Sequence, residues 1–522
     1  MMRFFNTTGP CDPRRHYMLG PEQRIPDLLP FVEQELYFVV HSARQTGKST
    51  AMLAFAERLR GLGYAAIHAT LEESQGIEDI ERAEPIWLYA LERGAQALRD
   101  ELRPGPSEAI LREAPGTRLA RFLAAWCAAI APVRLVLLLD EADVVSGPAM
   151  VSLLRQLRAG FVSRSIGDSP ASIGLIGMRD LRDYLSYAKD GSPLNPGSPF
   201  NIKSRSLTLR NFTAAEVAEL YGQHTAATGQ PFTAEASARA FWWTQGQPFL
   251  VNALARISVM ELAADPTQTI TEAHIDEAKE RLIRARTTHL DSLAERLKEE
   301  RVARIVQPVL LGDTPFAVPY EHDDFQYVLD LGLLQHGAAG AEAANPMYRE
   351  VLVRQLTLRM QKAISAPTWR WRTAAGRLDF PALVDAFLDW WRENADAITA
   401  HGNKQYPEAL PHLAFMAFLQ RVVNGGGTVL REYAAGRGAV DVVVTYGPDR
   451  FVVELKRVFR GGKGFDKVKQ QGIAQLSDYL DTLDEPEGWL IIFDQRASTS
   501  WEQRLWRDEQ TVGGRCLYLR GA

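Results

Sequence analysis

The sequence predicts an α/β fold built on a parallel sheet, and three observations lead to that prediction. Residues 37–50 read as a short apolar strand, a turn, and a helix that opens on Gly47-Lys48-Ser49. The apolar run Leu135–Leu139 ends in the acidic pair Asp140-Glu141. Through the first 210 residues, short apolar runs alternate with helical stretches, which is typical of a parallel sheet with helices on both faces.

Five short apolar runs are expected to form the strands of this N-terminal sheet. They are Tyr37–His41, Tyr64–His68, Arg134–Leu139, Ser172–Ile176 and Leu207–Leu209. From Thr213 the pattern changes, because Thr213 and Glu216 have the spacing of a capping box and strand patterns are scarce before Leu297. We therefore expect a helical domain directly after the sheet.

A second helical unit is expected over Val302–Leu358. It combines Phe325–Leu334 with a Gly/Ala-rich, hairpin-like stretch at Gly337–Gly340, and this order suits a winged helix. Ala366–Pro381 is rich in Trp, Arg and Pro and is expected to be a linker. The expected parts are an α/β core (1–210), a helical lid (211–297), a winged-helix-like domain (298–360), a linker (361–380) and a second α/β domain (381–522).

The second α/β domain is expected to begin with amphipathic helices at Ala382–Asn394 and Pro411–Val423, before a break at Gly425–Gly427. Three strands, a helix and a further strand follow in the pattern. Their expected ranges are Thr428–Tyr433, Ala439–Tyr446, Arg450–Lys456, Gly472–Leu483 and Trp489–Phe493.

The composition is that of an ordinary globular protein, with 46% hydrophobic and 24% charged residues in 522. The net charge of −5 excludes a global basic field, so any contact with nucleic acid must be local. The start lacks the apolar core of a signal peptide, and no apolar run approaches the ~20 residues that span a bilayer. Cys11, Cys127 and Cys516 form no CxxC pair. We expect a cytoplasmic protein without a zinc site or a disulfide framework.

The turn at residues 42–49 has the GxxxxGK[ST] pattern of a phosphate-binding loop, with Ser42 where the first glycine is expected. Backbone N–H groups and the positive end of a helix cradle nucleotide phosphates in this setting. Lys48 supplies a cation for the β- and γ-phosphates, and the Ser49 hydroxyl can bind Mg²⁺. ATP and Mg²⁺ are therefore the expected cofactors. The predicted nucleotide-binding residues are Ala43, Arg44, Gln45, Thr46, Gly47, Lys48, Ser49 and Thr50.

The acidic residues after Leu135–Leu139 form a Walker B arrangement. Asp140 can hold Mg²⁺ through water or through Ser49, and Glu141 can orient or deprotonate an attacking water. The alternative is a buried strand with a solvated acidic end. A third strand, Ile173–Gly177, leads to Arg179, which can reach the γ-phosphate. The alternative there is an ordinary surface pair of Arg179 with Asp180.

These residues resemble the signal-transducing (STAND) class of AAA+-related P-loop ATPases. That class carries an Arg-Asp sensor after its fourth core strand and a Gly-x-Pro turn in its helical domain, which Gly246-Gln247-Pro248 matches. The resemblance covers about residues 1–360 and implies that Arg179 and Pro248 lie at the nucleotide. It also implies that the segment Pro10–Leu19 contacts the adenine.

A second set of chemical groups lies near the C-terminus. Asp441 opens one expected strand, and Glu454 and Lys456 stand two residues apart on the next, so both point to the same face. Two carboxylates and a lysine on adjacent strands can hold Mg²⁺, which lowers the pKa of water and stabilises charge on a phosphate. Lys456 can orient the hydroxide or stabilise the transition state. The alternative is a strand pair with solvated charges.

This arrangement resembles the PD-(D/E)XK nuclease superfamily, with Asp441 as its Asp and Glu454-Leu455-Lys456 as its ExK. Glu432 matches the additional Glu of many members, and Glu408 is a weaker match. Gln475 with Tyr479 resembles the Gln-x-x-x-Tyr helix of one branch. The sequence departs from the family because no proline precedes Asp441.

The charge around the second site agrees with binding of a phosphate backbone, although a solvated loop is the alternative. Basic residues outnumber acidic ones between Arg450 and Lys469, and a Gly-rich basic loop lies at Arg460–Gly464. The stretch Trp369-Arg370-Trp371-Arg372 can stack bases or pack between domains.

Together these patterns predict an ATP-dependent switch that controls a Mg²⁺-dependent nuclease acting on DNA, with a possible homo-oligomer and no membrane. By analogy alone, this combination suggests prokaryotic defence against phage or mobile DNA. Two other functions remain open. One is a regulatory protein that binds nucleic acid or protein without cleaving it, and the other is a transposition-type or partner-loading ATPase.

Overall fold

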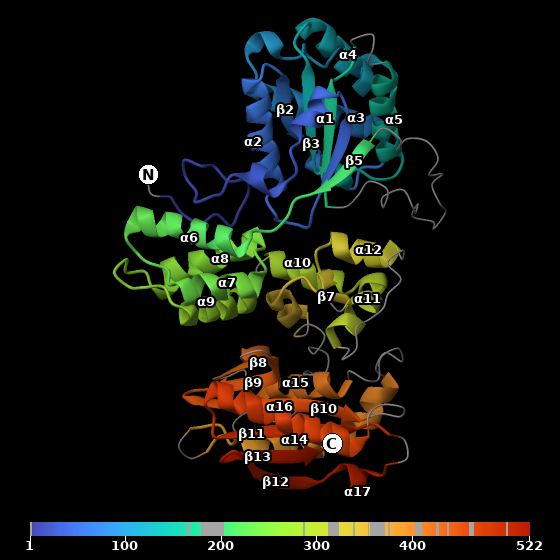
Figure 1. The fold of residues 1–522 in the computed structure, drawn as a ribbon. Helices are drawn as coiled ribbons and strands as arrows, with labels where there is room; N and C mark the ends of the chain where they lie inside the picture. The colour runs from blue at the N-terminus through green and yellow to red at the C-terminus, as the bar shows by residue number, and fades with distance from the viewer. Residues whose placement is uncertain are drawn as a thin grey trace. The chain divides into compact units, whose positions relative to one another are not determined.

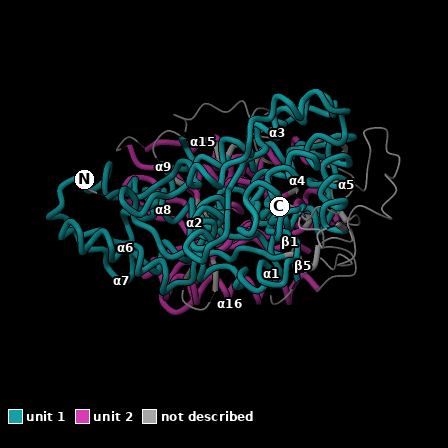
Figure 2. The backbone as a smooth tube through the Cα atoms, turned by 90° about the horizontal axis from the view of Figure 1, so that it is seen from above, with its two compact units in different colours: residues 1–305, 318–347 teal, residues 306–317, 348–522 magenta. Residues whose placement is uncertain are grey.

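The computed structural model divides the chain into two compact units (Figure 2). Unit 1 comprises residues 1–305 and 318–347, and unit 2 comprises 306–317 and 348–522. None of the helices in the described ranges is long and apolar enough to cross a membrane. The structure describes residues 3–163, 168–178, 203–285, 288–311, 323–337, 340–352, 354, 371–373, 376–401, 410–423, 427–435, 438–458, 464–496 and 499–522.

Unit 1 is built on a five-stranded parallel sheet with the strand order β2-β3-β4-β1-β5. The expected α/β class and parallel sheet are therefore confirmed. In this order β1 and β3 flank β4, so the segments that follow β1 and β3 meet at one edge of the sheet. The strands are β1 (Tyr37–His41), β2 (Ala65–Thr70), β3 (Leu135–Asp140), β4 (Ser172–Gly177) and β5 (Lys203–Thr208).

Helices cover both faces of this sheet (Figure 1). One face packs against α1 and α2 through Phe38, Val136 and Phe55, and the other packs against α3, α4 and α5 through a cluster that includes Trp87 and Trp126. All five of these side chains are at most 3% exposed. The helices are α1 (Leu29–Glu33), α2 (Lys48–Gly61), α3 (Ile80–Gly94), α4 (Arg118–Ile130) and α5 (Gly147–Ser163).

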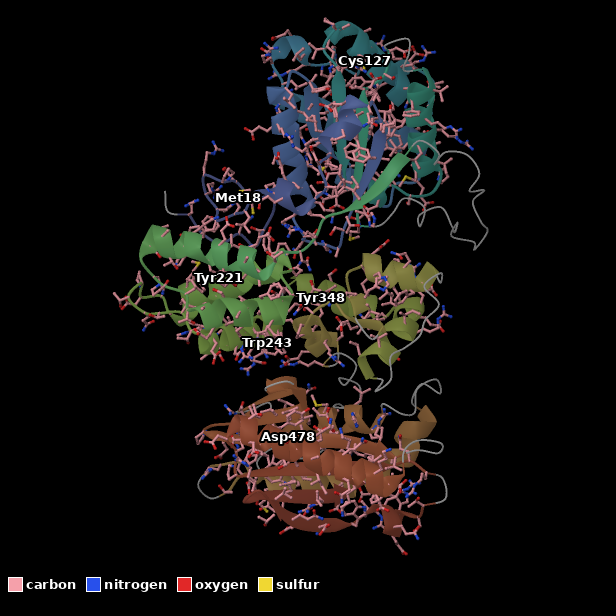
Figure 3. All side chains as sticks on the ribbon, viewed as in Figure 1. Met18, Cys127, Tyr221, Trp243, Tyr348 and Asp478 are labelled. Atoms are coloured by element: carbon pink, nitrogen blue, oxygen red, sulfur yellow. The ribbon has the colours of Figure 1, made fainter. Side chains whose placement is uncertain are left out.

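The helical lid follows β5 as expected. Thr213 caps α6 in a complete capping box with Glu216, so the predicted capping box is confirmed. Its helices are α6 (Ala214–Thr228), α7 (Ala234–Thr244), α8 (Pro248–Ile257), the π-helical η9 (Ser258–Leu262) and α9 (Glu272–Arg284). Tyr221 and Trp243, both labelled in Figure 3, are buried within the lid.

The region expected to form a winged helix contains helices followed by a two-stranded antiparallel sheet. The elements are α10 (Thr288–Arg296), α11 (Glu300–Leu311), α12 (Asp323–Asp330), β6 (Leu334–Gly337) and β7 (Gly340–Ala343). The division into units falls inside the expected 298–360 domain, because residues 306–317 and 348–352 group with unit 2. The winged-helix assignment stays a prediction.

Unit 2 has a six-stranded mixed sheet with the order β12-β13-β11-β10-β9-β8. Cluster residues of α14 and α15 pack on one face of it, and those of α16 pack on the other. The elements are α14 (Phe380–His401), α15 (Leu410–Val423), β8 (Gly427–Ala435), β9 (Gly438–Tyr446), β10 (Asp449–Val458), α16 (Phe465–Leu483), β11 (Glu487–Asp494), α17 (Trp501–Arg504), β12 (Arg507–Val512) and β13 (Arg515–Gly521).

Several expected boundaries need correction. The expected strand Leu207–Leu209 is β5, which begins at Lys203 because its polar first residues still pair with β1. The helix expected at Gly472 begins at Phe465, since the charged residues after Phe465 form its first turns. The strands β12 and β13 were not expected, because β12 reads Arg-Asp-Glu-Gln-Thr-Val and is mostly polar. Such an edge strand lacks the apolar alternation that sequence patterns depend on.

Short 3₁₀ helices lie between the longer elements of unit 1. They are η1 (Pro21–Arg24), η2 (Glu72–Ser74), η3 (Ala95–Ala97), η4 (Asp100–Leu102), η5 (Ile110–Arg112) and η6 (Ala142–Val144). Two of them matter for the site, because η1 ends in Arg24 and η6 directly follows the acidic pair at the end of β3.

Candidate functional site

The loop between β1 and α2 has the backbone conformation of a phosphate cradle. Gln45 and Gly47 have φ angles of 59° and 92°, and Gly47 directly precedes Lys48, the first residue of α2. Left-handed residues in such a loop turn successive N–H groups towards one side, next to the positive end of the helix. An anion at this place meets backbone donors and a helix terminus at once.

Ser42 replaces the first glycine of the motif and uses its hydroxyl. Its Oγ donates to the carbonyl oxygen of Leu209 at 3.1 Å, and its N–H donates to the carbonyl oxygen of Gly177 at 3.3 Å. Gly177 closes β4 and Leu209 follows β5, so Ser42 ties the start of the loop to both neighbours of β1. A glycine at this position would keep the turn and lose the hydroxyl bond.

Lys48 is buried, and its side chain folds back onto the loop between β1 and α2. Its Nζ donates to the carbonyl oxygens of Ser42 at 2.8 Å and Ala43 at 2.9 Å. Burial lowers the pKa of the Lys48 ammonium, and the nearby carboxylates of Glu141 and Asp140 oppose that shift. The two carbonyl contacts hold the ammonium beside the position where a phosphate would supply a full negative charge.

Asp140, at the end of β3, meets the first turn of α2. One of its oxygens, Oδ2, accepts a hydrogen bond from Ser49 Oγ at 2.5 Å and lies 3.0 Å from Nε2 of His68 on β2. Burial favours the neutral form of Asp140, but the bonds from His68 and Ser49 outweigh it and lower the pKa of the carboxyl. The carboxylate is therefore charged and oriented towards α2. His68 was not predicted, because a histidine at a strand end carries no motif of its own.

Glu141 has φ 53° and ψ 35°, a strained conformation for a residue with a side chain. Burial raises the pKa of its carboxyl, and the charges of Asp143 and Asp140 raise it further. Asp143 accepts a hydrogen bond from the N–H of Met178 at 2.8 Å, which joins the acidic segment to the end of β4. The predicted sensor Arg179 follows Met178 and lies outside the described residues.

The lid reaches the loop through the predicted Gly-x-Pro turn. Gly246 has φ 72°, and a Cβ built on it would lie 1.8 Å from the carbonyl oxygen of Phe212. Pro248 is buried and opens α8. Between them, the Gln247 amide Nε2 lies 3.4 Å and 3.3 Å from the carbonyl oxygens of Arg44 and Gln45 in the phosphate loop. Thus Gln247 contacts the loop directly, and the predicted place of Pro248 at the nucleotide stays a prediction.

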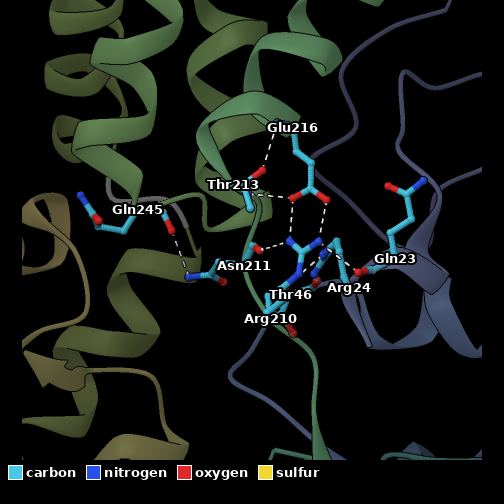
Figure 4. Close-up of polar contacts among 8 residues, drawn as sticks. All are labelled: Gln23, Arg24, Thr46, Arg210, Asn211, Thr213, Glu216 and Gln245. Carbon is cyan, nitrogen blue, oxygen red and sulfur yellow. Dashed lines mark hydrogen bonds and ion pairs between the residues drawn. The ribbon is translucent and has the colours of Figure 1, made fainter. Parts of the chain in front are cut away.

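Arg24 is a buried arginine beside the loop that sequence patterns did not indicate. Its Nη2 donates to the carbonyl oxygen of Thr46, and its Nε donates to that of Arg210 at 3.0 Å (Figure 4). The guanidinium also lies over the ring of Phe212, 4.6 Å from its centroid. Burial lowers the pKa of Arg24 to about 10, which leaves it charged at neutral pH. The side chain therefore joins the loop to the segment that enters the lid.

The segment predicted to contact adenine is fixed at both ends. The Cys11 N–H donates to Thr50 Oγ1 at 3.0 Å, at the start of α2. Further along, Met18, labelled in Figure 3, exchanges two backbone hydrogen bonds with the side chain of Gln223 on α6. The segment therefore bridges α2 and the lid. Its contact with a base stays a prediction.

In unit 2, the second predicted site lies where β9 and β10 part. The last pair in their register is Val442 with Val453, directly before Asp441 and Glu454. Asp441 Oδ2 accepts a hydrogen bond from the N–H of Leu455 at 2.8 Å, so its carboxylate reaches across to β10. The structure thus brings the two predicted carboxylates together.

Glu454 is 2% exposed and is bonded to Lys456, whose Nζ donates to Glu454 Oε1 at 2.5 Å. Its other oxygen, Oε2, is buried and accepts no hydrogen bond from the residues that the structure describes. Burial, with the charge of Asp441, raises the pKa of Glu454 to about 7 although Lys456 opposes the shift. A buried carboxylate oxygen in this state is disfavoured unless a proton or a cation joins it.

Gly472 was not predicted, yet it sets how α16 lies on this site. A Cβ built on Gly472 would lie 2.7 Å from Leu490 Cδ1 and 3.2 Å from Lys456 Cγ. The absence of a side chain lets α16 pack directly on the lysine stem. A glycine inside a helix gives no family pattern, but its unfavourable helix propensity was a usable signal of close packing.

Three further residues were predicted at the second site, namely Glu432, Gln475 and Glu408. Glu432 lies on β8 between Arg431 and Tyr433, whose partners on β9 place it level with Asp441. Gln475 is exposed on α16, three residues after Gly472, and its role at the second site stays a prediction. Glu408 lies outside the described residues.

Several basic residues near the second site already have partners. Arg450 pairs with Glu485 at 3.3 Å, and Lys469 pairs with Asp508 at 2.9 Å. Of the loop Arg460–Gly464, only Gly464 lies within the described residues. Trp371 is buried in the core of unit 2, which favours packing over base stacking for that residue. The neighbouring Trp369 and Arg370 lie outside the described residues.

Both sites can hold a hard divalent ion through oxygen ligands. Ser49 and Asp140 supply a hydroxyl and a carboxylate, and Asp441 and Glu454 supply two carboxylates. Within the described ranges, no group of three or more His, Cys, Asp or Glu side chains is placed to hold a metal. A pair of protein oxygens fits Mg²⁺, which usually retains several waters.

No family model matches the chain, and no curated protein matches it in sequence. Solved structures show similarity. A Walker-type ATPase of Pyrococcus abyssi, PABY2304, is 15% identical with a TM-score of 0.45, and the match covers 62% of this chain and 93% of that one.

Two further structures are similar over a comparable length. The Thermotoga maritima RuvB Holliday junction branch migration motor is 12% identical with a TM-score of 0.34, covering 62% of this chain and 90% of that one. The Aeropyrum pernix ORC1 protein, solved in complex with DNA, is 14% identical with a TM-score of 0.33, covering 63% and 91%. The fold assignment of unit 1 rests on its strand order and loop geometry rather than on these similarities.

Replacing Gly246 by alanine is expected to destabilise unit 1 by about 3 kcal/mol, because a Cβ meets the Phe212 carbonyl and φ is positive. Gly229 is the matched control. It also has positive φ, 79°, but no atom lies within 4 Å of its built Cβ, so Gly229→Ala should lose only about 1 kcal/mol. Denaturant unfolding measures both, and equal losses would contradict the close packing.

The metal-free protein is expected to lose stability as pH rises from about 5 to 8. The pKa of Glu454 is about 7 in the folded chain and 4.5 in an ordinary environment, so the folded state retains a proton that the unfolded state releases. Glu454→Gln removes this dependence. Thermal melting of both proteins in a chelator measures it, and parallel pH profiles would contradict the raised pKa.

Proposed function

We propose that unit 1 binds and hydrolyses ATP. The observation that carries this proposal is the meeting of Lys48, Ser49 and Asp140 at the sheet edge where β1 and β3 end, around a loop with left-handed residues. A cation, a hydroxyl and a charged carboxylate in this arrangement suit a nucleoside triphosphate with its magnesium ion.

Each residue has a distinct task in this reaction. Lys48 leaves the carbonyl oxygens of Ser42 and Ala43 for the β- and γ-phosphates, a short movement of a flexible side chain. Ser49 and Asp140 would hold Mg²⁺, which neutralises the phosphate charges when bound. Glu141 orients the attacking water and, with its raised pKa, can accept a proton from it.

The proposed ATPase acts as a switch rather than a motor, as the STAND resemblance implies. Contacts between the loop and the lid support this proposal, because Gln247 and Arg24 bond to loop carbonyls and also to lid or hinge backbone. Nucleotide state would then alter how the lid is held. Assembly of a homo-oligomer belongs to the same proposal.

We further propose that unit 2 is a Mg²⁺-dependent nuclease acting on DNA. The proposal is supported by the facing carboxylates of Asp441 and Glu454, the buried Oε2 of Glu454 and the adjacent ammonium of Lys456. Asp441 and Glu454 would hold the metal, and Lys456 would orient the attacking water. Control by the ATPase, a role in prokaryotic defence and a cytoplasmic location complete the proposed function.

Two other functions compete with the nuclease. In one, unit 2 binds nucleic acid or a protein without cleaving it, and ATP regulates that binding. In the other, the chain is a partner-loading ATPase that assembles on DNA and needs no carboxylates in unit 2.

Lys48→Ala is expected to weaken ATP binding at least ~100-fold, because it removes the cation at the phosphates. Glu141→Gln should leave the affinity within about twofold and slow hydrolysis by roughly 10²–10³-fold, since it removes the base. Calorimetry and phosphate release measure the two effects. Unchanged affinity in Lys48→Ala would refute ATP binding at this loop.

Asp441→Ala and Lys456→Ala are expected to reduce Mg²⁺-dependent DNA cleavage by roughly 10³-fold while ATP hydrolysis continues. Asp478→Ala is the matched control, because Asp478 is an exposed carboxylate on α16 (Figure 3). Single- and double-stranded DNA and RNA are incubated with and without ATP, and with EDTA. Cleavage by Asp441→Ala equal to wild type would refute the nuclease, and binding without cleavage would favour the regulatory alternative.

A further inference from the structure

The phosphate loop is held from outside by two side chains that contact its carbonyl oxygens. Arg24 donates to the carbonyl of Thr46, and Gln247 lies within 3.4 Å of the carbonyls of Arg44 and Gln45. Arg24 and Gln247 are 6% and 3% exposed. Three consecutive carbonyl groups of the loop thus have buried donors from other parts of the chain.

These contacts determine where the N–H groups of the loop point. In a trans peptide the carbonyl and the following N–H point in opposite directions. Fixing the carbonyls of Arg44, Gln45 and Thr46 therefore fixes the N–H groups of Gln45, Thr46 and Gly47 on the opposite side. Gly47 can adopt either sign of φ, and the positive φ of Gln45 is strained for a residue with a side chain, so the orientation of the loop needs an external restraint.

We propose that Arg24 and Gln247 are positioning residues that aim the phosphate-binding N–H groups, and that Gln247 makes this aim depend on the lid. The proposal rests on the ATP binding proposed above. Neither side chain touches the nucleotide in this scheme. They act through the backbone of the loop, which binds phosphate more tightly when its donors are already oriented.

The connection to the lid is direct for Gln247. Its Oε1 accepts a hydrogen bond from the N–H of Leu250 at 2.7 Å and so caps α8, while its Nε2 faces the loop. The turn that carries it is packed against the backbone of Phe212, since the N–H of Phe212 donates to the carbonyl of Gly246 at 2.9 Å. A movement of α8 therefore carries Gln247 with it.

Arg24 supplies the connection on the core side. It donates to the carbonyl of Arg210, and the Arg210 guanidinium donates in turn to the Gln23 carbonyl at 3.0 Å and to Glu216 at 2.6 Å and 2.8 Å (Figure 4). Glu216 belongs to the capping box of α6. The hinge between β5 and the lid is thus bonded to the same residue that holds Thr46.

The test uses variants that remove the reach to the loop and keep the rest. Gln247→Ser is neutral and retains an oxygen that can cap α8, but its side chain is too short for the loop carbonyls. Arg24→Lys retains the charge and loses the fork that serves two carbonyls at once. Thr233→Val is the control. It removes the hydroxyl of Thr233, which caps the lid helix α7 by accepting a hydrogen bond from the N–H of Ala236.

ATP affinity is expected to fall about tenfold in Gln247→Ser and in Arg24→Lys, because each variant removes a contact that orients the loop. In Thr233→Val the affinity should stay within about twofold. Hydrogen exchange in the nucleotide-free full chain gives a second readout. Residues 42–50 should exchange faster in Gln247→Ser and not in Thr233→Val, which a purely structural role in the lid would not produce.

The outcomes separate this inference from the proposed function. If wild type binds ATP and both loop variants bind it within twofold, with unchanged exchange at residues 42–50, the positioning role is overturned while ATP binding stands. If wild type binds no ATP, the proposed function fails, and the exchange measurement still decides whether Gln247 restrains the loop.

Discussion

The backbone of a short loop must present its N–H groups to one point, and the other parts of unit 1 are arranged around that requirement. Strand β1 delivers the loop to the edge of the sheet, and α2 continues it with an unpaired helix start. Ser42 bonds the start of the loop to the ends of two neighbouring strands, and the Lys48 ammonium bonds to two carbonyl oxygens of the loop. The sheet thus sets where the loop lies, while single polar side chains set the direction in which its N–H groups point.

The site in unit 2 depends on a cluster of ionisable side chains. It holds two carboxyl groups near each other, with Glu454 buried and Asp441 half-buried, and the ammonium of Lys456 only partly compensates them. Such an arrangement is unfavourable for an empty protein and favourable for one that takes up a cation. The parting of β9 and β10 at Asp441 and the closeness of Gly472 to Lys456 show that the backbone accommodates this cluster.

The parts of the fold that sequence reasoning identified are those with a strong local signal. The run Leu135–Leu139, the loop at Gly47 and the capping box at Thr213 each depend on residues adjacent in the chain, and all three are in place. β12 was missed because its residues are mostly polar and its place in the sheet depends on backbone pairing with β13.

Within the sites, the motif residues were identifiable and their partners were not. Lys48, Ser49 and Asp140 meet as the spacing predicts. His68 contacts Asp140, whereas Arg24 and Gln247 contact carbonyl groups of the loop. All three come from distant positions in the chain, and a single sequence carries no pattern for such contacts. The Gly-x-Pro turn at Gly246–Pro248 was identifiable from its family pattern, but the contact of Gln247 with the loop was not.

The distance along the chain between the loop and Gln247 has a consequence for synthesis. Arg44 and Gln247 are 203 residues apart, so at typical elongation rates the ribosome makes the lid roughly 10 to 40 s after the loop. During that time the strands and α2 can form while the loop lacks one of its two restraints. The nascent chain therefore passes through a stage in which the motif is complete but its loop lacks the contact with the lid.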